Sequence, residues 1–347
     1  MHPPSSVVAA PRHWVLPFAA SLSEPCQHAL PHLNAEGQLP LLPNLRRLLG
    51  ALQVSQRLEG DEYALSMPHE RVLAAEMGWL GTAADANPAD TDGLLPWAAW
   101  WAAQDGLKLD PTLCWGLLSP GHWLMGRDHL TLLDPATLGL SDDESRALLD
   151  IVRPLFEEDG WTLQWGTAQR WYAAHPSLEG LPTASLDRVI GRNPDLWLTD
   201  HPQARMVRRL QSEVQMLLYT HPLNEAREAA GLATVNSFWL SGCGRPPATT
   251  ALPAALQLVN DLRTPLLADD MPLWLEAWQH VDATVLKDVC TALDAGEAVK
   301  LTLCGDRHAV TLTPAAAPSL GTRLTRTLRQ LTGRPDTARV TDLLETL

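Results

Sequence analysis

Cysteine is scarce in this chain, and its spacing excludes two kinds of site. There is no Cys-x-x-Cys pair, and the five cysteines form an odd, scattered set: Cys26, Cys114, Cys243, Cys290 and Cys304. Such a set fits neither a zinc site nor a disulfide framework. Reduced thiols are typical of the cytoplasm, so we expect a cytoplasmic protein.

Long apolar runs are also missing. No window approaches the roughly 18 consecutive apolar residues that a membrane-spanning helix requires. The first residues contain no basic region followed by an uninterrupted apolar stretch, so we expect no secretory leader. A membrane partner is therefore not expected.

Positive charge is in deficit. The chain has 26 Lys plus Arg against 40 Asp plus Glu, a formal net charge of −14. A surface field of this sign repels phosphate backbones and anionic lipid headgroups. Nucleic acid is therefore not expected as a partner.

The residues that are present form a globular composition, with 46% hydrophobic and 19% charged residues. At roughly 150 residues per domain, the length suggests two domains. A nearly continuous apolar run predicts a buried strand over 13–20. Ser141 and Glu144 form a capping box that starts a helix. These patterns predict an α/β protein with a mixed sheet flanked by helices.

Two further segments give local predictions. Apolar runs between 113 and 133 are broken by Ser119-Pro120-Gly121, which indicates a hairpin turn. A helix over 201–220 has its apolar residues on one arc and Arg205, Arg208 and Arg209 on the opposite one. We interpret those arginines as solvated.

Tryptophan supplies 14 of the 20 aromatic residues. Trp97, Trp100 and Trp101 nearly adjoin, and such a cluster could stack a ligand or receive a protein partner. Large aromatic rings more often pack in cores, and we expect packing here.

One stretch carries a family resemblance. Gln211 to Pro247 reads QSEVQMLLYTHPLNEAREAAGLATVNSFWLSGCGRPP. It resembles a signature of archaeal-type cofactor-independent phosphoglycerate mutases, in which a helix ends in His-Pro-x-Asn, Arg follows, and Asn introduces a Trp-containing strand and a Gly-x-Gly turn. The matching residues are His221, Pro222, Asn224, Arg227, Gly231, Asn236, Trp239, Gly242 and Gly244.

Upstream elements resemble the same family in the same order: the strand near 130–133, the helix from Ser141, the strand bearing Arg170, and Leu181-Pro182-Thr183. The whole chain looks most similar to the bacterial branch of RpfE-type regulatory proteins. The resemblance implies an alkaline-phosphatase-like core, reduced here, from 1–112 and 246–347. An inserted α+β domain that grips the substrate would occupy 113–245.

The resemblance also implies two divalent metals that activate a serine nucleophile. In the family, an Asp-Gly directly after the first strand supplies the first ligand. Here that strand is followed by Ala20-Ser21-Leu22-Ser23, and no Asp precedes Asp61. Asp269, Asp270, His280 and Asp282 could be proposed as a remnant of the metal ligands. If this segment is helical, however, these residues lie mostly on a solvated face. We therefore predict neither a metal site nor a catalytic residue; Ser21 and Ser23 have no evident activating base.

Seven residues are candidates for binding a phosphorylated three-carbon acid: Arg170, His221, Asn224, Arg227, Asn236, Gly242 and Gly244. Guanidinium groups can bind carboxylate or phosphate through two parallel hydrogen bonds. In a structural alternative, Asn224 and Arg227 tie the turn after the long helix and His221 caps that helix's C-terminus. The two glycines shape a turn near a ligand or let a strand meet its neighbour.

Three functions follow from these observations. The leading hypothesis is a phosphoglycerate-mutase-like protein that has lost the two-metal centre and acts as a binding or regulatory protein. The second is an active mutase or phosphatase with displaced ligands, which would use Mn²⁺ or Mg²⁺. The third is a protein interaction scaffold, whose partner the sequence does not identify.

Overall fold

The computed structural model describes residues 10–34, 41–80, 88–126, 130–314 and 339–347. The chain divides into two compact units, one made of 1–62 with 253–347 and the other of 63–252. The sequence-based boundary lay between 112 and 113, whereas here 63–112 groups with the second unit. The cause is packing, because the helix over 97–104 contacts two strands of that unit.

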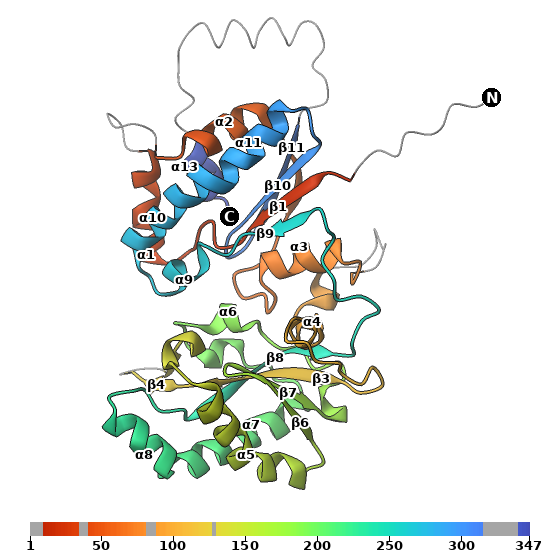
Figure 1. Cartoon of the computed structure of the whole chain (residues 1–347), viewed down its shortest axis with the longest axis vertical. Coiled ribbons are helices and arrows are strands. Elements are labelled where there is room, and N and C mark those ends of the chain that lie inside the picture. The colour runs from red at the N-terminus through yellow and green to blue at the C-terminus, as the bar shows by residue number, and fades with distance from the viewer. Residues whose placement is uncertain (1–9, 35–40, 81–87, 127–129, 315–338) are drawn as a thin grey trace, which may run out of the picture. The chain divides into compact units, whose positions relative to one another are not determined.

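The first unit contains a mixed five-stranded sheet in the order β2-β11-β10-β1-β9 (Figure 1). Its strands are β1 (Arg12–Leu16), β2 (Leu52–Leu58), β9 (Leu256–Leu258), β10 (Val299–Cys304) and β11 (Ala309–Pro314). Strand β1 is parallel to both β10 and β9, while β11 is antiparallel to β10 and β2.

Helices flank this sheet, and α11 packs on β10 and beside α2. The helices are α1 (Glu24–Ala29), α2 (Pro43–Ala51), α9 (Arg263–Leu267), α10 (Met271–Val281), α11 (Lys287–Asp294) and α13 (Arg339–Leu344). The expected fold class, a mixed sheet flanked by helices, is confirmed.

The second unit is built on an antiparallel sheet in the order β6-β7-β3-β8. Its strands are β3 (Trp115–Gly121), β6 (Thr162–Thr167), β7 (Arg170–Ala174) and β8 (Ser237–Gly244), with a separate pair β4 (Trp123–Met125) and β5 (Leu130–Leu132). Its helices are α3 (Pro68–Glu76), α4 (Trp97–Gln104), α5 (Asp142–Glu158), α6 (Leu186–Val189), α7 (Ala204–Tyr219) and α8 (Pro222–Ala229).

Alternating side chains make the second unit a three-layer structure. Leu118 and Trp171 belong to the core beneath α5 and α7, whereas their neighbours Leu117 and Tyr172 pack against α4. Successive residues of a strand point to opposite faces, so one sheet serves two cores. Figure 1 shows α4 on one side of this sheet and α5 with α7 on the other.

The predicted capping box is confirmed. The Ser141 hydroxyl accepts a hydrogen bond from Glu144 N at 3.2 Å, and the Glu144 carboxylate accepts one from Ser141 N at 3.0 Å. The hairpin prediction was wrong. Strand β3 continues through Pro120 to Gly121, and both residues pair with β8.

All five cysteines are free and buried. Within the described ranges, none of the helices combines the length and apolar character needed to cross a bilayer.

Candidate functional site

The carboxyl ends of parallel strands are where α/β sheets usually bind ligands. In the first unit, Ser21 follows β1 and Asp306 follows β10. The Ser21 hydroxyl donates to Asp306 Oδ2 at 2.8 Å, and Leu22 N donates to the same oxygen at 3.0 Å. Ser21 therefore has a carboxylate partner, which the sequence did not reveal. The pair is buried, so it joins two loops at this edge.

Apolar residues close the space directly after β1. Phe18, Ala19 and Ala20 are buried, and Phe18 has a φ of 60°. The Trp274 indole N–H donates to Phe18 O at 3.2 Å. Burial also raises the pKa of the nearby Cys26 thiol to about 12, so this thiol is not a thiolate nucleophile at neutral pH.

The described side chains do not fit the two cations implied by the resemblance. Across those residues, no group of three or more His, Cys, Asp or Glu side chains could hold a metal ion. Asp282 is buried, not solvated as expected, and its Oδ1 accepts from Leu45 N at 2.7 Å at the start of α2. Asp270 caps α10 through Leu273 N at 3.1 Å. These carboxylates stabilise helix starts.

Arg170 is held by an internal carboxylate. Its Nε and Nη2 donate to the two oxygens of Asp105 at 2.9 and 2.5 Å, and its guanidinium lies 4.7 Å from the Trp101 ring centroid. The Tyr172 hydroxyl donates to Asp105 Oδ2 at 2.5 Å. Asp105 ends α4, so Arg170 fastens that helix to β7.

Arg227 is 2% exposed and makes three hydrogen bonds within the protein. It donates from Nε to Ala233 O at 2.8 Å, from Nη1 to Glu144 Oε1 at 3.0 Å, and from Nη2 to Leu138 O at 2.5 Å. The guanidinium thereby joins α8, the segment before β8, and the region around the start of α5.

Asn224 and Asn236 tie neighbouring backbone segments. Buried Asn224 donates to Leu218 O at 2.9 Å and to Val235 O at 2.8 Å, and accepts from Val235 N at 3.0 Å. Asn236 accepts from Trp123 N at 2.7 Å and donates to Trp123 O at 3.1 Å.

His221 caps a helix, but not the expected one. Its Nδ1 accepts from Leu223 N at 3.2 Å at the start of α8. The imidazole points its acceptor into the first turn of α8 because Pro222 begins that helix directly after it. The C-terminus of α7 therefore does not use this side chain.

Gly242 and Gly244 lie within β8, which agrees with the second of the two roles considered for them, the close approach of a strand to its neighbour, and not with a turn. A Cβ on Gly242 would lie 2.8 Å from both Ala98 N and Trp97 Cβ, and a Cβ on Gly244 would lie 2.8 Å from Pro96 Cβ. Both glycines therefore let α4 and the residue before it approach the strand closely.

The seven candidate residues form two separate groups. Arg170, Gly242 and Gly244 all contact the α4 region. The other four join α7, α8 and the segments that lead into β4 and β8. The structure does not bring the seven around one cavity.

The tryptophan cluster packs as expected. Trp97 and Trp100 are buried, and their ring centroids are 5.7 Å apart in an edge-to-face arrangement. Trp79 extends the contact to Trp97 at 4.9 Å.

The sequence did not reveal a charged cluster between α3 and α6. His69 Nε2 lies 3.9 Å from Asp187 Oδ2, and Arg188 is 1% exposed. Glu70 accepts from Met67 N at 2.9 Å. Burial, opposed by this hydrogen bond and one from Ser185, raises the pKa of Glu70 to about 7.

This shift predicts how stability changes with pH. Glu70 is protonated in both the folded and the unfolded chain below its ordinary pKa of 4.5. As the pH rises toward 7, only the unfolded chain releases the proton, so the free energy of unfolding falls. Glu70→Gln removes this titration and keeps an acceptor for Met67 N.

We expect the free energy of unfolding of Glu70→Gln to equal that of the wild type near pH 4.5 and to exceed it at pH 8. The gain is about 2 kcal/mol once the partial exposure of Glu70 is allowed for. Urea denaturation at both pH values measures it. Glu158→Gln, an exposed change on α5, is the control. Parallel pH profiles for wild type and Glu70→Gln would contradict the prediction.

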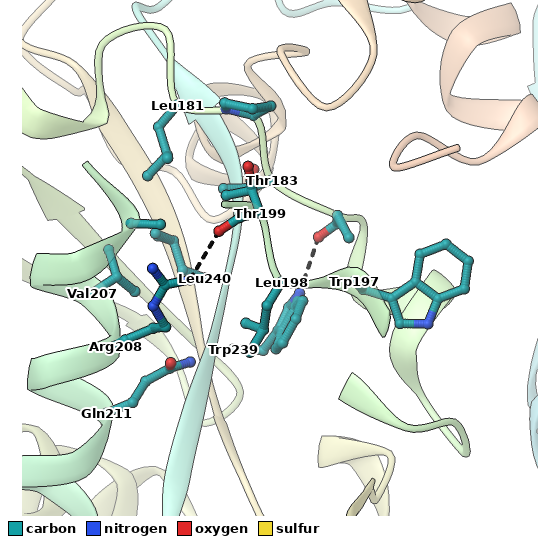
Figure 2. Close-up of a pocket in the computed structure, with 13 residues that line it drawn as sticks. Leu181, Thr183, Trp197, Leu198, Thr199, Val207, Arg208, Gln211, Trp239 and Leu240 are labelled. Atoms are coloured by element: carbon teal, nitrogen blue, oxygen red, sulfur yellow. Dashed lines mark hydrogen bonds between the residues drawn. The ribbon is translucent and has the colours of Figure 1, made fainter. Parts of the chain in front are cut away.

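A pocket lies inside the second unit, between α7, β8 and the loops over 181–184 and 197–199 (Figure 2). Its empty volume is about 390 Å³, part of it open to solvent. Its lining is mostly apolar, and Trp239 donates its indole N–H to Ala184 O at 3.0 Å. The pocket is lined by Leu181, Pro182, Thr183, Ala184, Trp197, Leu198, Thr199, Ala204, Val207, Arg208, Gln211, Trp239 and Leu240.

Arg208 is the residue of this pocket whose role sequence reasoning missed. It was assigned to the solvated face of the helix, but it is half-buried and its Nη1 donates to Thr199 O at 3.0 Å. The spacing of apolar residues in a helix does not indicate that the loop over 197–199 covers this face of α7.

Comparisons with known proteins give similarities of structure. No protein-family model and no curated protein matches the chain. The structure of a cofactor-independent phosphoglycerate mutase from Thermoplasma acidophilum DSM 1728 aligns over 90% of this chain and 91% of that chain, at 13% identity and a TM-score of 0.35. The PH0037 protein from Pyrococcus horikoshii aligns over 89% and 88%, at 12% identity and a TM-score of 0.43. These similarities assign neither an activity nor a site to this chain.

Proposed function

We propose that this chain is a phosphoglycerate-mutase-like protein that acts by binding, in a regulatory role of the RpfE type, and not by two-metal catalysis. The motifs between Gln211 and Pro247 support the relationship. The proposed loss of catalysis rests on one observation, the packing of the residues that follow β1. Phe18, Ala19 and Ala20 are buried where the family places its first metal ligand.

The partner of Ser21 supports the same view. A serine nucleophile needs a base or a metal to activate it at neutral pH. The Ser21 hydroxyl donates to a carboxylate that also accepts from Leu22 N. These two hydrogen bonds fix the loop after β1. Among the described residues, no cluster of metal ligands accompanies them that could hold a cation to stabilise the charge of a transferring phosphoryl group.

A phosphorylated three-carbon acid is the ligand that the resemblance suggests. The two arginines expected to hold it, Arg170 and Arg227, are already paired with Asp105 and Glu144. The described geometry therefore favours a different ligand for a protein that acts by binding.

The test is an assay of the purified chain for interconversion of 3- and 2-phosphoglycerate, with Mn²⁺ or Mg²⁺ added and with an authentic mutase as positive control. We expect no metal-dependent turnover, and no stoichiometric metal in the dialysed protein. Turnover that a chelator abolishes would overturn the proposal. If the Ser21→Ala variant then lacked this turnover, the reaction would be assigned to the carboxyl ends of the strands of the first unit.

A further inference from the structure

The pocket of the second unit has a wall suited to the apolar part of a ligand. Leu198, Val207 and Leu240 contribute aliphatic surface, and Trp239 contributes a ring whose N–H is already bonded. Figure 2 shows these side chains around the pocket. Pockets with mostly apolar walls and a few polar groups bind ligands whose apolar body is buried and whose polar end is oriented.

One cation borders this apolar wall. Arg208 uses Nη1 to donate to Thr199 O, which holds the guanidinium across the loop. In the part of the chain that the structure describes, Arg208 has no carboxylate partner, in contrast to Arg170, Arg209 and Arg227. Its Nε and Nη2 can therefore donate two parallel hydrogen bonds to a carboxylate.

The charge of the pocket limits the ligand further. Among the described residues that line the pocket, Arg208 is the one with a charged side chain, and the buried amide of Gln211 is already bonded to Phe238 O at 3.1 Å. A single guanidinium balances one carboxylate, whereas a phosphorylated acid carries more negative charge than this wall can neutralise. The empty volume of about 390 Å³ is near the lower end of the range of small-molecule pockets, which favours a small ligand.

We propose that this pocket binds a small monocarboxylic acid with an apolar body. The carboxylate accepts hydrogen bonds from Arg208, and the body lies against Trp239 and Leu198. The inference rests on the proposed function, because it names the ligand class of a chain that acts by binding.

The experiment compares phenylacetate and 4-methylpentanoate with their neutral amides, using calorimetry and the fluorescence of the full chain. We expect the acids to bind, to raise the melting temperature and to change tryptophan emission, since a ligand that binds only the native state stabilises it. Each amide should bind at least about tenfold more weakly, the loss expected when a charged hydrogen-bond partner is removed. 3-Phosphoglycerate should bind more weakly than either acid.

Variants of two arginines on α7 test where the carboxylate of the ligand binds. Arg208→Gln should lower the affinity for the acids by about tenfold or more, so that each acid and its amide bind with nearly equal affinity. Arg208→Lys should restore part of the preference for the acid. Arg205→Gln, an exposed change on α7, should leave both affinities unchanged.

Two results would overturn the inference: no binding of either acid to the folded chain, or equal binding of acid and amide by the wild type. If Arg208→Gln left acid binding unchanged, the assigned position of the carboxylate beside Arg208 would be refuted. The mutase assay separates this failure from that of the proposed function. Metal-dependent turnover overturns the proposed function whatever the acids do, whereas absence of acid binding without turnover overturns this inference alone.

Discussion

Arg227→Met is expected to lower the free energy of unfolding of the second unit by about 3–5 kcal/mol. Methionine fills part of the same volume but donates no hydrogen bond. Leu138 O and Ala233 O would each lose the donor that Arg227 now provides, and an unsatisfied buried carbonyl costs about 1–3 kcal/mol. Loss of the ion pair with partly exposed Glu144 adds to this cost.

Urea denaturation followed by tryptophan fluorescence measures the change, because 11 of the 14 tryptophans lie within residues 63–252. The matched control is Arg209→Met on α7. Arg209 also pairs with carboxylates, Asp159 and Glu213, but its side chain is 51% exposed. An exposed ion pair contributes less than about 1 kcal/mol, so the control should remain close to the wild type.

The outcome also decides between the two interpretations of Arg227. A strong loss of stability supports the alternative in which it ties the turn after the long helix. Wild-type stability in Arg227→Met would contradict the structural role and would favour Arg227 as a ligand-binding residue.

The fold could be predicted from sequence where the signal is local. The capping box at Ser141 lies within four consecutive residues, and the apolar arc of α7 recurs at helical spacing, so both were recognised. Strand β2 was missed because its residues 53–57 are exposed and show no alternation of buried and exposed side chains. The composition of Ser119-Pro120-Gly121 predicts a turn, and the pairing of Pro120 with Phe238 has no local signal because the partner strand lies far along the chain.

The candidate site could be predicted less well, because its interactions are not local. Residue type indicated that Arg227 can bind an anion, but not that the anion is Glu144, 83 positions away. Likewise Arg170 meets Asp105 across 65 positions. Arg208 shows the opposite case: its place on the helix suggested solvent, and only the loop over 197–199 makes it part of a pocket.

Gly242→Ala is expected to lower the free energy of unfolding of the second unit by about 3–4 kcal/mol, from two separate causes. Gly242 has a φ of 63°, a conformation that costs an L-residue about 1–2 kcal/mol. The added Cβ would also lie 2.8 Å from Ala98 N and from Trp97 Cβ, atoms that no side-chain rotation can move away. Relief requires α4 to shift from β8, which disturbs the core that includes Ala98 and Trp115.

Gly231→Ala separates these two causes. Gly231 has a φ of 73°, but nothing lies within 4 Å of its Cβ position. Its substitution should therefore cost only the conformational part, about 1 kcal/mol. The same denaturation measurement compares both variants, and hydrogen exchange over 97–104 reports whether α4 has loosened. If Gly242→Ala were as mild as Gly231→Ala, the close approach of α4 to β8 would be refuted, and a role for this glycine beside a ligand would gain support.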